Sequence, residues 1–385
     1  MTDRNAITRQ QLEERASKKW SQFPGAIGAW IAEMDFPVAQ PIRDSLVDFD
    51  ARELYGYAPD AVKDDMRRAT ADFYARRYGW EFAPEYVDTA SDVLSGMGAV
   101  LDLFSEPGSA VIVPTPNYMP FFTVPGLHGR RIIQVPMLHE AGQWSFDLEG
   151  IARAFDDGAG LLIMCNPHNP IGRVYTREEL LAVSEVVERK GGRVFSDEIH
   201  APLTYEGRRH VPYASVSPAA AAHTVTVTSA SKSFNTPGLK CAQIIFSNDA
   251  DLDVWKAKGH FIAEGASTPG ILAAIAAYDR GGEWLADTID YLQGNRDALA
   301  DDLAELLPQV GYEKPEGTYV AWLDVRRLGI PGNPQRFFLD SARVATTDGE
   351  LCGRAGDGHV RFNMALPRPI LREAVESMAA AVDAL

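Results

Sequence analysis

The sequence predicts an α/β protein, with a large domain built on a mostly parallel sheet and a smaller α+β domain at the C-terminal end. Short apolar strands alternate with amphipathic helical stretches through the middle of the chain, and a long amphipathic run separates them from a last group of strands and one helix. The length of 385 residues exceeds the usual size of one hydrophobic core, which favours two domains of unequal size.

Six apolar segments are expected to be strands, because they are rich in β-branched residues and bounded by Gly and Pro. They cover residues 108–116, 129–137, 158–167, 191–200, 223–231 and 240–247. Helical stretches lie between several of them, the clearest being "TREELLAVSEVVERKGG" at 176–192, which ends in a Gly stop. Strands that alternate with helices indicate a parallel sheet covered on both faces. The Ala-rich segment 217–223 is interpreted as a short connector.

The last third of the chain has a different pattern. Residues 282–311 form one long amphipathic run, expected to be a helix that links two domains. "GTYVAWLDV" and "HVRFNMALP" follow as expected strands, and "ILREAVESMAAAVDAL" as a closing helix. We therefore expect an N-terminal segment over 1–48 that packs on the small domain, a large domain over 49–281 and a small domain over 282–385.

Composition and charge limit the classes of function. A hydrophobic share of 46% and a charged share of 23% are typical of a soluble globular protein. The formal net charge of -16 disfavours nucleic acid as a partner. The spacing of Cys165, Cys241 and Cys352 suits neither a metal site nor a disulfide framework. With a polar N-terminus and no long apolar stretch, the expectation is a cytoplasmic protein without metal or membrane partner.

Polar residues follow three of the predicted strands. Asn169 follows "LLIMCNP", Asp197 ends "GRVFSD", and Lys232 follows "TVTSAS". The carboxyl ends of parallel strands meet at one edge of the sheet, where α/β proteins bind ligands. A lysine at such a place is ordinarily a solvated loop residue, but an amine, a carboxylate and an amide together predict a site.

These three groups are what a pyridoxal phosphate site requires. A lysine binds the aldehyde covalently, and a carboxylate keeps the pyridine nitrogen protonated, so that the ring accepts electrons. The phosphate needs hydroxyls, a cation and a helix N-terminus. Candidates for that part are Ser229, Ser231, Lys240 and the Ser95–Gly96 turn.

The chain resembles the fold-type I pyridoxal phosphate enzymes of the aspartate aminotransferase superfamily, and within them the cystathionine β-lyase (C-S lyase) branch of the maltose-regulon modulator type. The ordered motifs that carry the resemblance are "WIAEMDFPVAQPI", "YGYAPD", "PTPNYMPFF", "CNPHNPIGRV", "SDEIHAPLTYEGRRHVPYASV", "SASKSFNTPGLKCAQ", "EGTYVAWLDVR" and "HVRFNMALPRP". The resemblance implies a seven-stranded sheet, bound pyridoxal 5'-phosphate, an amino-acid substrate and a homodimer with shared active sites.

The resemblance also implies roles for individual residues. Lys232 matches the lysine that carries the cofactor, Asp197 the partner of the pyridine nitrogen and Asn169 the contact to the phenolate oxygen. Tyr118 matches an aromatic residue that stacks on the cofactor, and Arg361 an arginine that grips the substrate carboxylate. The remaining implied cofactor contacts are Val93, Leu94, His200, Ser229, Ser231, Lys240 and, from the neighbouring subunit, Tyr57.

Three positions bear on how far the resemblance reaches. Relatives of the aminotransferase branch usually have Arg where this chain has Lys240, and lyases usually show "PGVVPAL" where it has "SDVLSGM" at 91–97. Asp92 thus replaces a glycine near the phosphate, which leaves the contacts there open. His200 fits the "DEIH" of the lyases, with a structural histidine as the alternative.

The function expected from the resemblance is β-elimination: cleavage of L-cystathionine or a related cysteine thioether to a thiol, pyruvate and ammonia, as in methionine biosynthesis. The same core residues also suit an aminotransferase, and a regulatory protein that keeps the cofactor is a third alternative. Trp30, Met119 and Phe121 are candidates for the pocket that holds the leaving group.

Overall fold

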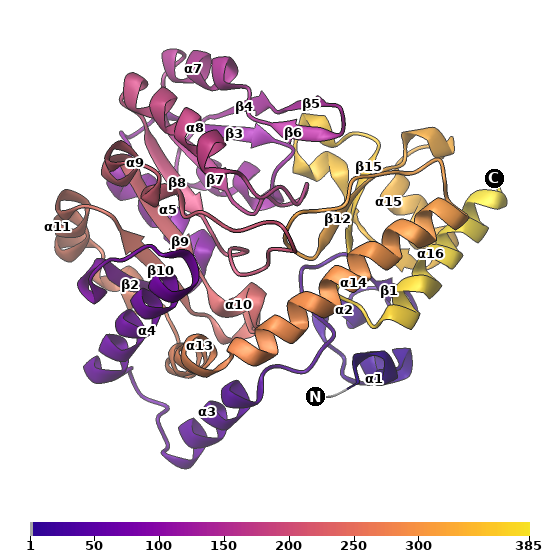
Figure 1. Ribbon diagram of the computed structural model, residues 1–385, viewed down its shortest axis with the longest axis horizontal. Helices are drawn as coiled ribbons and strands as arrows, with labels where there is room; N and C mark the ends of the chain where they lie inside the picture. The colour runs from indigo at the N-terminus through magenta and orange to yellow at the C-terminus, as the bar shows by residue number, and fades with distance from the viewer. Residues whose placement is uncertain (1–2) are drawn as a thin grey trace.

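A seven-stranded sheet forms the centre of the larger part of the molecule. The computed structural model describes residues 3–385 (Figure 1). The strand order is β2-β10-β9-β8-β7-β3-β4. Its strands are β2 (Val87–Ala90), β3 (Ala110–Thr115), β4 (Ile132–Pro136), β7 (Ala159–Cys165), β8 (Arg193–Asp197), β9 (Thr224–Thr228) and β10 (Ala242–Phe246). β10 runs antiparallel to both of its neighbours and the other pairs are parallel. The predicted fold class and the six predicted strands are confirmed; β2, only four residues long, was not predicted.

Helices cover both faces of this sheet. Side chains alternate between the faces of a strand, so Leu161 and Ile163 of β7 share a buried cluster with residues of α5 (Val93–Phe104) and α11 (Asp249–Lys258). Leu162 and Met164 instead pack with residues of α7 (Leu148–Asp156) and α8 (Arg177–Lys190). The continuous apolar runs of the sequence reflect this burial on two sides.

Local capping fixes where the helices of the large sheet begin and end. α8 starts with a capping box between Thr176 and Glu179 and ends at Gly191 with a positive φ of 64°, so the predicted helix is confirmed. The interpretation of residues 217–223 as a connector is wrong. They form α9 (Pro218–His223), because Pro218 starts the helix and the Ser217 side chain accepts a hydrogen bond from the Ala220 N–H.

The C-terminal part contains the predicted long helix, two predicted strands and closing helix. α14 (Gly282–Leu306) runs as one long rod toward α16 (Arg368–Asp383) in Figure 1. It ends five residues before the end of the predicted run, where the chain turns into a short edge strand. A four-stranded sheet of order β11-β12-β15-β14 lies here, with β11 (Gly311–Tyr312), β12 (Val320–Asp324), β14 (Thr347–Asp348) and β15 (His359–Asn363).

The N-terminal residues contact both parts of the molecule. β1 (Ile27–Gly28) pairs in parallel with β13 (Val344–Ala345), while α3 (Gln40–Ala51) packs against α13 (Thr268–Arg280). A boundary between residues 48 and 49 falls inside α3. The division into three segments therefore remains a proposal.

The remaining α-helices and strands are short, apart from one helix beside the large sheet. They are α1 (Arg9–Glu14), α2 (Lys18–Ser21), α4 (Asp60–Tyr78), α6 (Val124–Leu127), α10 (Ala230–Ser233), α12 (His260–Ala263), α15 (Pro334–Phe337), β5 (Leu138–Glu140) and β6 (Gln143–Ser145). Over residues 3–385 we find no helix with the length and apolar character needed to cross a bilayer.

Candidate active site

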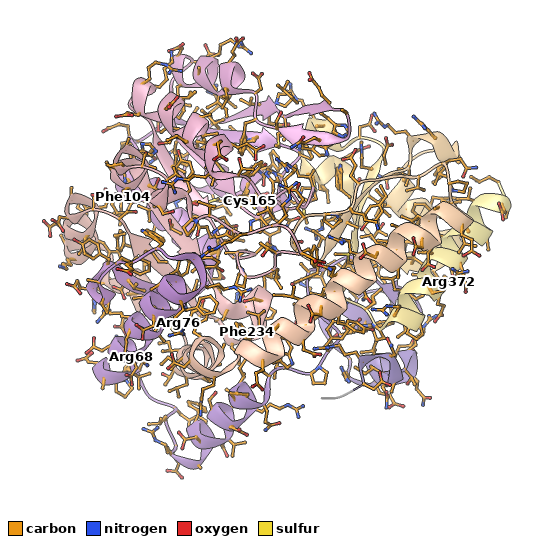
Figure 2. The ribbon with its side chains drawn as sticks, viewed as in Figure 1. Arg68, Arg76, Phe104, Cys165, Phe234 and Arg372 are labelled. Carbon is orange, nitrogen blue, oxygen red and sulfur yellow. The ribbon has the colours of Figure 1, made fainter. Side chains whose placement is uncertain are left out.

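A cavity of about 610 Å³ opens where β7, β8 and β9 end. Cys165 and Asp197 are paired in the sheet, and Asp197 is paired with Val227, so the three strands end side by side. Figure 2 labels Cys165, a buried cavity residue, near the middle of the molecule. On its other side the cavity is lined by Trp30, Thr347 and Arg361 from outside the large sheet. The predicted edge of the sheet is therefore one wall of the site.

Lys232 reaches this cavity from α10, the single helical turn that follows β9. The Ser229 side chain caps that turn by accepting a hydrogen bond from the Ser231 N–H. The Lys232 amine donates to the carbonyl oxygen of Ala32 over 2.8 Å. Burial, with the charge of Arg361, lowers the pKa of Lys232 from 10.5 to about 8. A larger share of this amine than of an ordinary lysine is therefore neutral and nucleophilic near neutral pH.

Asp197 ends β8 and is buried in the cavity wall. Its carboxylate accepts a hydrogen bond of 3.0 Å from the Ile199 N–H. Burial and, less strongly, the neighbouring Glu198 carboxylate raise the pKa of Asp197 to about 7, although the hydrogen bond from the Ile199 N–H and the charge of Lys232 oppose the shift. A buried carboxylate in this state favours a cationic N–H partner.

Arg361 comes from β15 and is held by three oxygen acceptors. Its guanidinium donates to Asn169 Oδ1 over 3.1 Å, to the Trp30 carbonyl oxygen over 2.9 Å and to Thr347 Oγ1 over 3.2 Å. The side chain is almost fully buried but lines the cavity. This network fixes the guanidinium at the cavity wall, where its positive charge and remaining N–H groups are suited to binding a carboxylate.

The predicted phosphate-binding residues meet at one end of the cavity. Val93, Leu94, Ser229, Ser231 and Lys240 all line it. Val93 and Leu94 are the first two residues of α5, where helix N–H groups have no partner within the helix.

The expectation for the Ser95–Gly96 turn is wrong, since neither residue lines the cavity. The Ser95 N–H is already bound by the Asp92 side chain. Gly96 faces the sheet, where a Cβ atom would lie 2.9 Å from Val227 Cγ1. Val93 and Leu94, the first two residues of α5, line the cavity where the Ser95–Gly96 turn was predicted to do so.

Aromatic and imidazole side chains complete the inner wall. Tyr118 lines the cavity, its ring edge-on to Phe121 with centroids 5.4 Å apart. His200 also lines it, and its buried Nδ1 makes no hydrogen bond to any residue in the described range 3–385. Burial lowers the pKa of His200 to about 3, aided by the charges of Lys232 and Arg361, so this imidazole is neutral.

Two predicted residues lie elsewhere. Phe121 is fully buried and packs edge-on against Phe195, so it belongs to the core, whereas Trp30 and Met119 do line the cavity. Tyr57 is 94% exposed and borders a separate depression beside Lys63. Within one chain the structure does not bring Tyr57 to the site.

Other cavity residues were not predicted. Phe23, Gln335, Asp348 and Leu351 line it, as do Ala32 and Glu33. Thr347 was also missed, although it binds Arg361. These residues lie in loops or short elements far apart in the sequence, and no local pattern marks them.

Comparison with known proteins assigns the chain to a family. Residues 32–378 match the aminotransferase class I and II family, and the chain belongs to it. It is 39% identical to a cystathionine beta-lyase of Corynebacterium glutamicum, over 96% of this chain and 98% of the relative.

Two solved structures are also similar. A crystal structure of a PLP-dependent beta-cystathionase, described as putative, from Corynebacterium diphtheriae matches with a TM-score of 0.93 and 38% identity, over 98% of both chains. The PLP-bound C-S lyase of Staphylococcus hominis matches with a TM-score of 0.92 and 26% identity, over 99% of both chains.

The residues of the cavity fit pyridoxal phosphate. Lys232 supplies a partly neutral amine, and Asp197 a carboxylate without a full complement of donors. The Nδ1 of His200, which has no hydrogen-bond partner among residues 3–385, is available to a polar group of a ligand. The Ser231 hydroxyl, Lys240 and the start of α5 supply donors that a phosphate requires, whereas the Ser229 hydroxyl already donates to the Cys241 carbonyl oxygen.

Proposed function

We propose that this protein is a pyridoxal phosphate-dependent carbon-sulfur β-lyase, which cleaves L-cystathionine or a related cysteine thioether to a thiol, pyruvate and ammonia. The observation that carries the proposal is the convergence of Lys232, Asp197 and Arg361 on one cavity. The lyase names of the relatives, over nearly the whole chain, favour elimination over amino-group transfer.

Some residues of the cavity would hold the cofactor, and others would bind the substrate. Bound pyridoxal phosphate supplies an aldehyde for an amine and a ring that accepts electrons from the substrate Cα. Asp197 would keep the ring nitrogen protonated, Tyr118 would pack on the ring, and His200 and Asn169 would offer polar groups to it. Val93, Leu94, Ser229, Ser231 and Lys240 would hold the phosphate.

Arg361 binds the carboxylate of the substrate and fixes its orientation. The Lys232 amine would take the proton from the substrate Cα as a general base. The bond between Cβ and sulfur then breaks, and the sulfur leaves with the electron pair as a thiolate. Addition of one water overall converts the remaining three-carbon fragment to pyruvate and ammonia.

Arg361 is already oriented before substrate arrives. Asn169, Trp30 and Thr347 hold its guanidinium by direct hydrogen bonds. Little conformational freedom is lost when a carboxylate binds, which favours a productive geometry.

We propose further that the protein works as a homodimer in the cytoplasm and serves methionine biosynthesis. Tyr57 is almost fully exposed within one chain. In a dimer this side chain is free to reach the phosphate of the neighbouring subunit.

A product assay tests the proposed reaction. The protein loaded with pyridoxal phosphate is offered L-cystathionine, L-cystine and a panel of amino acids with 2-oxoglutarate, and pyruvate, thiol and keto acid are measured separately. We expect pyruvate and thiol in equal amounts from L-cystathionine. Keto-acid formation from the panel without pyruvate from the thioethers would instead identify an aminotransferase, and negligible turnover of every substrate would favour the regulatory alternative.

A further inference from the structure

The phosphate end of the cavity contains a carboxylate as well as a cation. Asp92 lines the cavity together with Val93, Leu94, Ser231 and Lys240. One carboxylate oxygen accepts hydrogen bonds from the Ser95 N–H over 2.8 Å and the Ser95 hydroxyl over 3.0 Å. The other oxygen lies 3.0 Å from the Lys240 amine. The groups suited to an anion are therefore partly occupied by an anion of the chain itself.

The carboxylate of Asp92 is ionised under working conditions. Partial burial opposes ionisation, but the Ser95 N–H and Lys240 hold the pKa of Asp92 below its usual value. Lys240 has no second acidic partner within 4.0 Å in the described part of the chain. The positive charge of Lys240 therefore interacts both with Asp92 and with any anion that enters the cavity.

We propose that Asp92 is an internal competitor for the phosphate of the cofactor: it neutralises Lys240 and caps α5 in the cofactor-free chain, and it weakens the binding of the phosphate dianion. The proposal rests on the proposed function only in that pyridoxal phosphate is the ligand. Because like charges disfavour each other's ionised form, Asp92 also raises the second pKa of the bound phosphate.

The size of the effect follows from exposure. The Lys240 and Asp92 side chains are 56% and 38% exposed, so solvent screens their charges and the effect is that of a surface pair rather than a buried one. Replacing the carboxylate by a neutral group should strengthen cofactor binding about fivefold at low salt. Screening by salt should reduce that gain.

Two variants separate charge from structure. Asp92→Asn and Asp92→Ser both keep a side chain that caps a helix N-terminus well, but both remove the charge. Asp102→Asn is the control, because Asp102 lies on the same helix, is exposed and contacts His128 instead of the cavity. The parent protein and these three variants then differ from one another in net charge by at most one.

The experiment measures binding rather than turnover. Cofactor-free protein is titrated with pyridoxal phosphate and with pyridoxal, which lacks the phosphate, and the absorbance of the lysine-bound form gives both dissociation constants at low and high salt. The phosphorus resonance of the bound cofactor is followed against pH. We expect tighter binding of pyridoxal phosphate by both Asp92 variants, unchanged binding of pyridoxal, a gain that shrinks in salt and a lower phosphate pKa.

Two results would overturn the inference. One is equal affinity of all four proteins for pyridoxal phosphate; the other is an equal gain for pyridoxal, which would make the effect structural. If the parent protein forms no lysine-dependent absorbance band at all, the proposed function itself fails. If the absorbance band forms but the affinities for pyridoxal phosphate do not differ, the role of Asp92 is refuted and the proposed function is not affected.

Discussion

Replacing Arg361 by lysine tests the substrate-binding fork. The guanidinium is held in place by Asn169 Oδ1, the Trp30 carbonyl and Thr347 Oγ1. Arginine gives a carboxylate two parallel charge-assisted hydrogen bonds, whereas lysine gives one from a compact charge. A hydrogen bond to a charged group contributes roughly 1.5–3 kcal/mol. Losing one of the two, at about 2 kcal/mol, should lower kcat/KM about 30-fold.

The assay follows pyruvate release against thioether concentration, with the absorbance of the bound cofactor as a control that Arg361→Lys still loads. An inhibitor with the same thioether side chain but no α-carboxylate should bind the parent and the variant equally. Arg361→Ala should be worse, since it also leaves the three acceptors without their donor. The loss of one charged hydrogen bond should change kcat/KM by far more than about twofold. If the kcat/KM of Arg361→Lys stays within about twofold of the parent value, the substrate carboxylate does not bind to Arg361.

Other perturbations address the cofactor, the proton chemistry and the frame of the site. Lys232→Ala should remove the yellow lysine-bound absorbance and turnover; the same band retained after borohydride treatment, with no modified lysine, would contradict its role. Asp197→Asn keeps the shape but not the charge, so single-turnover rates should fall by about 30- to 150-fold, for roughly 2–3 kcal/mol; an unchanged rate would exclude the electron-sink role. The pKa of Lys232 is lowered from 10.5 to about 8, so the neutral fraction of its amine increases as the pH rises through this value. The rate of cofactor attachment, measured by stopped flow, should therefore rise with pH with a midpoint near 8. A midpoint near 10.5 would show that the pKa of this lysine is not lowered. Gly270→Ala should lower the thermal midpoint by several degrees, since its Cβ would lie 2.1 Å from the Leu239 carbonyl oxygen and such overpacking costs about 1–3 kcal/mol; an unchanged midpoint would show that the start of α13 shifts freely.

Local sequence patterns predicted the strands of the large sheet and the site residues that lie at the ends of these strands. Strand β9 and the turn after it followed from "TVTVTSAS", and this alone placed Lys232 at the end of a buried strand. The same holds for Asp197 at the end of β8. These positions depend on alternation, capping and short connections, which act over a few residues. The short edge strand β2 and helix α9 were missed because neither presents a long enough pattern.

Family resemblance supplied what periodicity could not. Arg361 lies in an apolar strand, where nothing local marks it as a ligand-binding residue, and it is 192 positions from its partner Asn169. Tyr57 had a predicted role, but within one chain it borders a separate depression and does not line the cavity.

By itself the sequence determined the α/β class, the order of the main elements and the placement of an amine and a carboxylate at one edge of a parallel sheet, because hydrophobic periodicity and capping are local. Only the tertiary structure decided that Trp30 and Thr347 hold Arg361, and that Asp92 contacts Lys240 from 148 residues away. The physical reason is that such contacts depend on how separate elements pack, and packing is a property of the whole chain rather than of any segment.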